Sequence, residues 1–259
     1  MCIMPFDSDK ITRAADLIRA AKRLTVLTGA GVSKESGVPT FRDAQTGLWA
    51  QYDPTRLATR NAFIGNPKLV WDFYEFRRSI MRPAKPNPGH VALAALEKRF
   101  PAYPLITQNI DQLHEEAGST HVIHLHGLIA ENKCLYDCQG DPTPVDVTSA
   151  KVDESTGVPL CPHCRQFARP AVVWFGENLP KRELSQAFEA AKNSDLMIVV
   201  GTSGVVYPAG QLPYFVKQHG GVVIDVNPEA SEITAISDVW LDAPSGEVLP
   251  RVVEIIEHE

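Results

Sequence analysis

The spacing of apolar and polar residues along the chain predicts alternating helices and strands. A helical pattern begins after Ser8 and Asp9, whose side chains are suited to cap it. Further helices are predicted over 67–82 and from Pro88. Continuous apolar runs, typical of strands buried on both faces, occupy 24–28, 104–107, 195–201 and 221–226. This order predicts an α/β fold with a parallel sheet covered by helices.

Each predicted strand is followed by glycine or polar residues. The four strand ends are Gly29-Ala30-Gly31, Gln108-Asn109-Ile110-Asp111, Gly201-Thr202-Ser203 and Asn227-Pro228-Glu229. The carboxyl ends of parallel strands meet at one edge of a sheet, which is where ligands bind in such folds. We therefore expect these residues to form a cofactor crevice.

The first strand end has the form of a Rossmann-type phosphate loop. Glycines at positions 29 and 31 allow backbone amides to approach a pyrophosphate. The dehydrogenase fingerprint is incomplete, because Lys34 stands where its third glycine belongs and the acidic residue for the ribose is missing. A loop carrying Phe41 and Arg42 follows instead. The spacing alone leaves open both a dinucleotide site and a structural glycine turn.

Length and charge narrow the class of protein. The 259 residues suffice for one large core, or for a core domain with a small module. The net charge of −6, with no basic run longer than Arg77-Arg78, argues against nucleic-acid binding. No apolar stretch is long enough to span a membrane, and no targeting segment is visible. We expect the cytoplasm, with the mitochondrion and nucleus as alternatives.

Two pairs of cysteines predict a metal site. The pairs are Cys134-x-x-x-Cys138 and Cys161-x-x-Cys164. In a chain without a signal peptide, metal binding or free thiols are favoured over disulfides. Two such pairs can surround one zinc ion tetrahedrally, and a site with four protein ligands is structural rather than catalytic. The first pair has one residue more than the usual spacing, so its turn must bulge. Four incidental thiols are the alternative.

Two polar runs supply candidate catalytic groups. Residues 107–114 place amides and a carboxylate just past a strand end. Farther along, the alternation after Val122 and Ile123 predicts that His124 and His126 point to the same side. A histidine at a strand end beside polar side chains is a candidate general base, although a lone histidine is more often structural. The absence of a Gly-x-Ser-x-Gly elbow argues against a Ser-His-Asp hydrolase.

Together these runs resemble the sirtuins, the NAD-dependent protein lysine deacylases. The matching segments follow the family's order from Leu24 to Pro250: residues 29–42, 108–111, 126–127, the four cysteines, 174–177, 201–203 and Asn227. The resemblance implies a Rossmann-like NAD-binding domain over 8–50, 84–130 and 170–259. A small domain would combine a helical insertion, 51–83, with a zinc module, 131–169. We also expect a monomer that binds acyl-lysine proteins.

The resemblance also implies the reaction and the roles of its residues. NAD is consumed as a co-substrate: the acyl oxygen attacks the ribose carbon that bears nicotinamide, and nicotinamide and O-acyl-ADP-ribose are released. His126 would be the general base, Asn109 would orient the ribose and a water, and Asp111 would hold the nicotinamide carboxamide. The other implied NAD contacts are Gly29, Ala30, Gly31, Phe41, Arg42, Gln108, Ile110, Gly201, Thr202, Ser203, Asn227, Pro228, Glu229 and Ser245. The substrate peptide is expected to pair as a strand between 175–177 and 204–207.

One helix indicates the acyl group. Tyr74 and Arg77, at i and i+3, share a helical face, and arginine beside a phenol can bind a carboxylate. With the small Ala58, this pattern resembles the class III sirtuins, which remove succinyl, malonyl and glutaryl groups. The implied substrate-binding residues are Ala58, Tyr74, Arg77, Val173, Phe175, Leu179 and Val206.

Several alternatives remain open at the level of sequence. Tyr74 and Arg77 could lie on a solvated helix face, in which case an ordinary deacetylase is expected. A protein ADP-ribosyltransferase would use the same NAD crevice. A non-catalytic NAD-dependent binding module would not need His126, Asn109 and Asp111 together. The loop at 43–48 is one residue longer than in class III, which could alter NAD affinity.

Overall fold

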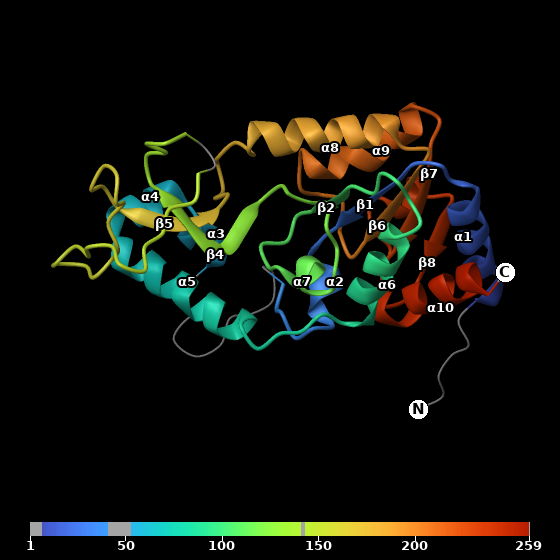
Figure 1. Ribbon diagram of the computed structural model, residues 1–259, viewed down its shortest axis with the longest axis horizontal. Helices are drawn as coiled ribbons and strands as arrows, with labels where there is room; N and C mark the ends of the chain where they lie inside the picture. Colours follow the sequence, from blue (N-terminus) through green and yellow to red (C-terminus); the bar gives the residue numbers. More distant parts are fainter. Residues whose placement is uncertain (1–6, 41–52, 141–142, 259) are drawn as a thin grey trace. The chain divides into compact units, whose positions relative to one another are not determined.

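The computed structural model describes residues 7–40, 53–140 and 143–258. The chain divides into two compact units (Figure 1). Unit 1 consists of Met1–Thr40, Lys85–Leu125 and Arg182–Glu259. Unit 2 consists of Phe41–Ala84 and His126–Lys181.

Unit 1 is built on a six-stranded sheet in the order β3-β2-β1-β6-β7-β8, and every neighbouring pair is parallel. The strands are β1 (Leu24–Thr28), β2 (Leu105–Thr107), β3 (Val122–His124), β6 (Leu196–Val200), β7 (Val222–Val226) and β8 (Val239–Leu241). In the central pair, Leu24 lies opposite Leu196 and Thr28 opposite Val200. The predicted α/β fold with a parallel sheet is therefore confirmed.

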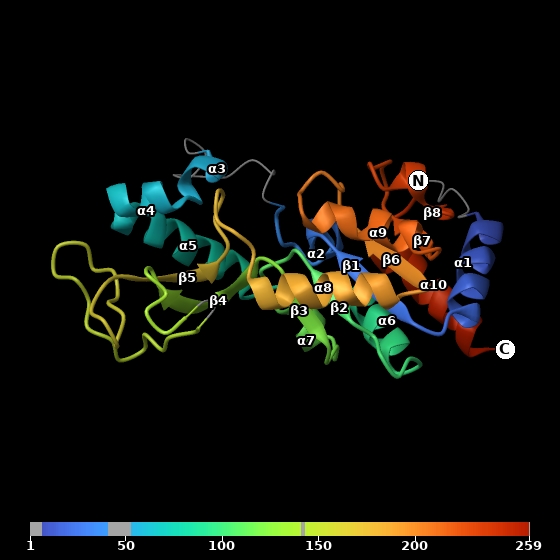
Figure 2. The ribbon, with the colours of Figure 1, turned by 90° about the horizontal axis from the view of Figure 1, so that it is seen from above.

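Helices cover both faces of this sheet. They are α1 (Ser8–Ala20), α2 (Ala30–Lys34), α6 (Pro88–Glu97), α7 (Leu113–Glu116), α8 (Lys181–Asn193), α9 (Leu212–Gln218) and α10 (Ser245–Glu257), with short 3₁₀ turns η2 (Ala209–Gln211) and η3 (Thr234–Ile236). Figure 1 shows α8 and α9 on one side of the sheet and α6 and α10 on the other, and in Figure 2 α8 and α9 lie over the strands. The main core joins α1, α6 and α10 to the sheet through residues such as Ile18, Leu24, Leu93, Ile198, Ile224 and Val252. Because both faces are covered, the strands contain few polar positions.

Two local expectations are wrong. The first helix is capped by Asp7, whose carboxylate accepts from the backbone amides of Asp9 and Lys10, and not by Ser8 or Asp9. The alternation through His124 and His126 also fails, because β3 ends at His124 and the chain turns before Gly127.

Gly127 explains that turn. Its φ is +74°, and a Cβ at this position would meet the Ala171 carbonyl oxygen at 2.0 Å. The left-handed backbone and the close approach both require glycine there. The turn ends the parallel sheet and begins a strand of the other unit.

Unit 2 combines helices with a small antiparallel sheet. The helices are α3 (Pro54–Leu57), α4 (Arg60–Gly65) and α5 (Pro67–Met81), and the strands are β4 (Gly127–Cys134) and β5 (Ala168–Val172). Asn66 caps α5 by accepting from the Leu69 amide, and Pro67 occupies its first turn. Phe63 packs between unit-2 aromatics, with Phe167 edge-on at 6.0 Å and Trp174 at 5.3 Å. In the described part of the chain, no helix has the length and apolar character needed to cross a membrane.

Candidate active site and metal centre

The turn from β1 into α2 lies against the end of β6. The Gly29 amide donates to the Val200 carbonyl at 2.9 Å, and the Gly31 amide donates to the Gly201 carbonyl at 2.8 Å. A Cβ on Gly31 would lie 2.7 Å from Gly201 Cα. Close backbone approach is therefore one reason for these glycines, and it leaves the N-terminus of α2 at the carboxyl edge of the sheet.

A hydrogen-bonded chain of buried side chains follows at the same edge. The Asn109 amide nitrogen Nδ2 donates to Ser33 Oγ at 3.0 Å, and Ser33 Oγ donates to Asp111 Oδ2 at 3.0 Å. The other carboxylate oxygen of Asp111 accepts from the Leu113 amide. Burial raises the pKa of Asp111, against the opposing effect of these hydrogen bonds. The amide and the carboxylate are thus held in fixed orientations.

Thr202 links three of the predicted strand ends. Its hydroxyl accepts from Gln108 Nε2 at 2.9 Å, and its carbonyl accepts from Asn227 Nδ2 at 2.9 Å. The ends of β2, β6 and β7 are therefore tied together as the parallel topology predicts. Beyond them Pro228 and Glu229 are exposed, while Ile110 and Ser203 are half-buried.

Ser245 is at the start of α10. Its hydroxyl donates to Glu35 Oε1 at 2.8 Å, and the next amide, of Gly246, also donates to that carboxylate. The predicted residues Phe41 and Arg42, and the loop at 43–48, lie outside the described residues.

Behind this edge lie two buried histidines that the sequence analysis did not single out. His114 Nε2 is 2.9 Å from Thr28 Oγ1, which donates to Thr107 Oγ1, and that oxygen accepts from the Asn109 amide. The ring of His90 lies 4.8 Å from that of His114. Burial lowers the pKa of His90 to about 4 and of His114 to about 3, so both are neutral at physiological pH. In the sequence, the threonines at the ends of otherwise apolar strands were the signal that could have pointed to buried polar partners such as these histidines.

In unit 2, His126 lies at the turn before β4. His126 is half-buried, and its backbone carbonyl accepts from the Val173 amide at 2.9 Å. Nearby in the same unit, the Phe175 amide donates to the Ala58 carbonyl at 2.9 Å, and Thr59 pairs with Phe175 as a parallel bridge. The structure thus brings together Ala58 and Phe175, which are far apart in the sequence.

Tyr74 and Arg77 do not lie on a solvated face. Tyr74 is 2% exposed and Arg77 9% exposed, and the Arg77 guanidinium lies over the Phe73 ring. Burial raises the pKa of Tyr74 to about 12 and lowers the pKa of Arg77. Leu179 is half-buried in the same unit, whereas Val206 is an exposed residue of unit 1.

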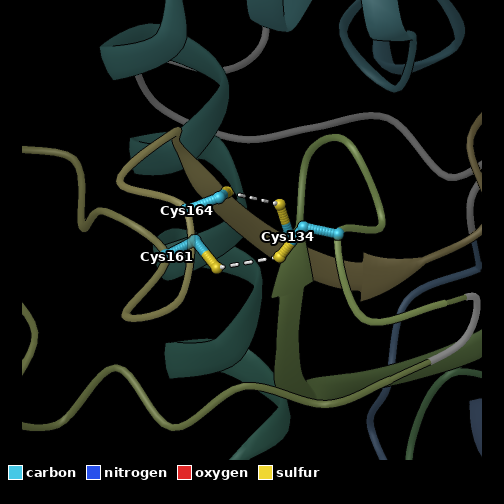
Figure 3. Close-up of side chains that lie close together, drawn as sticks. Cys134, Cys161 and Cys164 are labelled. Atoms are coloured by element: carbon cyan, nitrogen blue, oxygen red, sulfur yellow. Dashed lines mark hydrogen bonds between the residues drawn. The ribbon is translucent and has the colours of Figure 1, made fainter.

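The four cysteines of unit 2 converge. Their sulfur atoms all lie within 4.8 Å of one another, with Cys134 and Cys164 at 3.4 Å and Cys138 and Cys161 at 3.6 Å. Figure 3 shows the labelled thiols of Cys134, Cys161 and Cys164 pointing toward one another. Four sulfurs about 2.3 Å from a tetrahedral zinc ion are about 3.8 Å apart, so the donor set fits zinc.

The extra residue between the first two cysteines is accommodated by a left-handed turn. Asp137 has a φ of +50°, and its amide donates to the Cys134 carbonyl at 3.2 Å. This bulge returns Cys138 to the other sulfurs, so the longer spacing is compatible with a four-cysteine site.

Comparison with known proteins gives consistent matches. The model of the Sir2 family matches residues 29–208. An "NAD-dependent protein deacylase" of Pyrococcus abyssi is 49% identical over 248 residues, covering 96% of this chain and 98% of that protein. The structure of a Sir2 homolog in complex with NAD has a TM-score of 0.85 at 41% identity, covering 95% of this chain and 93% of the other. A structure of Sir2 bound to acetylated peptide has a TM-score of 0.83 at 34% identity, covering 96% of this chain and 99% of the other.

Proposed function

The chain belongs to the Sir2 family of NAD-dependent protein deacylases, the sirtuins, and we propose that it removes acidic acyl groups, namely succinyl, malonyl and glutaryl, from lysine. The observation that carries the acyl preference is the burial of Tyr74 and Arg77 together on one face of α5. An acetyl group ends in a methyl, which gains nothing from contact with a buried cation. A succinyl group ends in a carboxylate, which can bind that cation.

The energetics support this assignment. A buried guanidinium is costly, and a carboxylate that it binds offsets part of that cost through charge-assisted hydrogen bonds. Hydrogen bonds to charged groups contribute about 1.5–3 kcal/mol, which corresponds to roughly one to two decades in affinity. A tyrosine hydroxyl is protonated at neutral pH, and burial raises the pKa of Tyr74 further, to about 12, so the hydroxyl can donate to the same carboxylate.

Unit 1 supplies the residues proposed to bind NAD. NAD provides the ribose carbon from which nicotinamide departs. The Asp111 carboxylate would accept from the nicotinamide carboxamide, and the Asn109 side chain would orient the ribose. The backbone amide of Ala30, at the N-terminus of α2, would face the phosphates. Gln108, Thr202, Ser203 and Asn227 would line the remaining crevice at the strand ends.

Unit 2 supplies the proposed general base and the acyl site. The His126 imidazole would accept a proton from a ribose hydroxyl. The exposed Phe175, bonded through its amide to Ala58, would contact the acyl-lysine, with Val173 and Leu179 beside it in the chain. The peptide backbone would add as a strand to segment 175–177, where Phe175 is exposed.

The cysteine cluster is proposed to hold one structural zinc ion. With Cys134, Cys138, Cys161 and Cys164 as ligands, no coordination position remains for a substrate. The metal would therefore stabilise unit 2 and take no part in the acyl chemistry.

The decisive experiment compares kcat/KM on matched succinyl-lysine and acetyl-lysine peptides with NAD, for wild type, Arg77→Met and Arg82→Met. Arg82 follows α5 and is exposed, so it serves as the matched control. We expect Arg77→Met to lower the succinyl-to-acetyl ratio about ten- to a hundredfold, and Arg82→Met to leave it unchanged. Equal turnover of both peptides by the wild type, unaffected by Arg77→Met, would identify an ordinary deacetylase.

Deacetylation is the second candidate. It is favoured by the likeness to the structure described as Sir2 bound to acetylated peptide. The same experiment separates the two, since only an acidic-acyl deacylase loses its selectivity with Arg77.

A further inference from the structure

A hydrogen bond joins two buried aromatic residues of unit 2. Trp174, just after β5, donates through its indole Nε1 to the hydroxyl oxygen of Tyr74 on α5, at 2.9 Å. Both residues are almost completely buried, at 1% and 2% exposed. We propose that Trp174 is a specificity-positioning residue: by donating to Tyr74, it leaves the phenolic O–H to be donated to the carboxylate of an acidic acyl group. This inference rests on the proposed function.

The direction of the bond follows from the chemistry of the two groups. An indole N–H can only donate, whereas a phenol has one proton to donate and lone pairs that accept. At this contact the Tyr74 oxygen must therefore accept. Its proton has to point to an acceptor other than the indole. A phenol keeps this proton at neutral pH, and burial raises the pKa of Tyr74 further, to about 12.

A carboxylate is the acceptor that best suits this donor. Arg77 lies one turn along α5 on the same face, and burial there makes its positive charge most effective toward an anion. A carboxylate can accept from the phenol and the guanidinium at once. The methyl group of an acetyl chain accepts from neither, so the orientation of Tyr74 discriminates between the two substrates.

An ion pair between a fully buried arginine and a half-buried glutamate holds the indole in place. The Arg169 guanidinium lies over the Trp174 ring, 3.3 Å from its centroid, and is fully buried. It donates to both carboxylate oxygens of Glu177, at 2.5 and 3.1 Å. The same carboxylate accepts from the Trp174 amide at 2.9 Å. The ring and the backbone of Trp174 are thus fixed by one pair of charged side chains.

The position of Trp174 in the chain connects it to the rest of the proposed acyl site. The next residue, Phe175, is 54% exposed and is bonded to Ala58. A buried tryptophan directly before an exposed aromatic anchors the segment from inside. Its indole N–H also makes the Tyr74 oxygen the acceptor of their hydrogen bond, which leaves the phenolic proton free to be donated elsewhere.

The test replaces only the donor. Trp174 is substituted by β-(3-benzothienyl)alanine, which keeps the bicyclic shape but carries sulfur in place of N–H, and by phenylalanine. Each is made alone and with Tyr74→Phe. The measurements are kcat and KM on succinyl-lysine and acetyl-lysine peptides, and the dissociation constant of the succinyl peptide without NAD.

We expect the benzothienyl variant to raise KM and the dissociation constant for the succinyl peptide about three- to tenfold, with kcat and acetyl turnover unchanged. In the Tyr74→Phe background it should change nothing further, because the effect passes through the Tyr74 hydroxyl. Equal losses of affinity for the succinyl and acetyl peptides, or a loss of affinity that adds to that of Tyr74→Phe, would overturn the inference and make Trp174 a packing residue.

The wild type separates the two proposals. A wild-type enzyme without succinyl preference refutes the proposed function, and this inference falls with it. A wild-type enzyme that prefers succinyl, together with a benzothienyl variant of unchanged selectivity, refutes this inference alone.

Discussion

Close backbone approach requires glycine at single positions along the carboxyl edge of the sheet. Gly201 has a φ of +61°, and a Cβ there would lie 2.4 Å from the Val32 amide nitrogen. That atom belongs to α2 and cannot move without displacing the β1–α2 turn. Gly37 has a similar φ of +80°, but a Cβ on it would meet nothing within 4 Å. Substitution at both positions strains the backbone, but only substitution at Gly201 also produces steric overlap.

We expect Gly201→Ala to lower the free energy of unfolding by at least about 2 kcal/mol more than Gly37→Ala does. Both variants share the backbone strain, and only Gly201→Ala adds steric overlap of the new Cβ. Urea unfolding of the two variants beside wild type measures this difference. NAD affinity should fall with Gly201→Ala only. Equal costs for both variants would mean that the turn relaxes, contrary to the expectation.

At the scale of elements, the segment between β4 and β5 has little core of its own. Its buried cluster consists of Cys134, Val145, Cys161 and Ala168, with Val147 and Cys164 packed against it. Since three of these six side chains are proposed metal ligands, we expect the segment to depend on the ion for much of its stability. The neighbouring aromatic cluster around Trp174 does not include the ligands.

Metal analysis should find one zinc ion per chain in wild type and in Cys2→Ser, and a large loss in Cys161→Ser. Cys2 lies outside the described residues and is not one of the four clustered cysteines. Chelation should accelerate proteolysis within residues 135–165 before the parallel sheet unfolds. Zinc content that is unchanged in Cys161→Ser would contradict the assignment of the ligands.

At the scale of the whole molecule, the two buried histidines couple folding to pH. Burial lowers their pKa values below the ordinary 6.5, to about 4 for His90 and about 3 for His114. Below pH 6.5 the unfolded chain therefore binds protons that the folded chain does not. Their contribution to stability is complete above pH 6.5 and declines as the pH falls toward 4 and 3.

Replacing His114 by Gln should reduce the pH dependence of stability between pH 6 and 5 by up to about 1.4 kcal/mol per pH unit, the effect of one proton. His258→Gln, at an exposed position, should leave it unchanged. Urea unfolding at pH 7, 6 and 5 tests both. An identical slope for His114→Gln and wild type would show that His114 takes up its proton in the folded state too.

Features with a local pattern could be predicted from the sequence alone. Buried parallel strands read as continuous apolar runs, and their polar ends fall at one edge because the strands run parallel. Paired cysteines predict a metal site in the same way, since a short turn is enough to bring the two thiols of each pair to one ion. The order of motifs was also sufficient for the resemblance to the sirtuins, and the family comparison confirms it.

Contacts between residues distant in sequence were decided by tertiary structure. Ser33 meets Asn109 and Asp111, and Trp174 meets Tyr74 across 100 positions, because strand order and helix packing bring those segments together. Periodicity along a chain relates a residue only to its near neighbours. It could place Tyr74 and Arg77 on one face of a helix, but burial of that face depended on what packs against it.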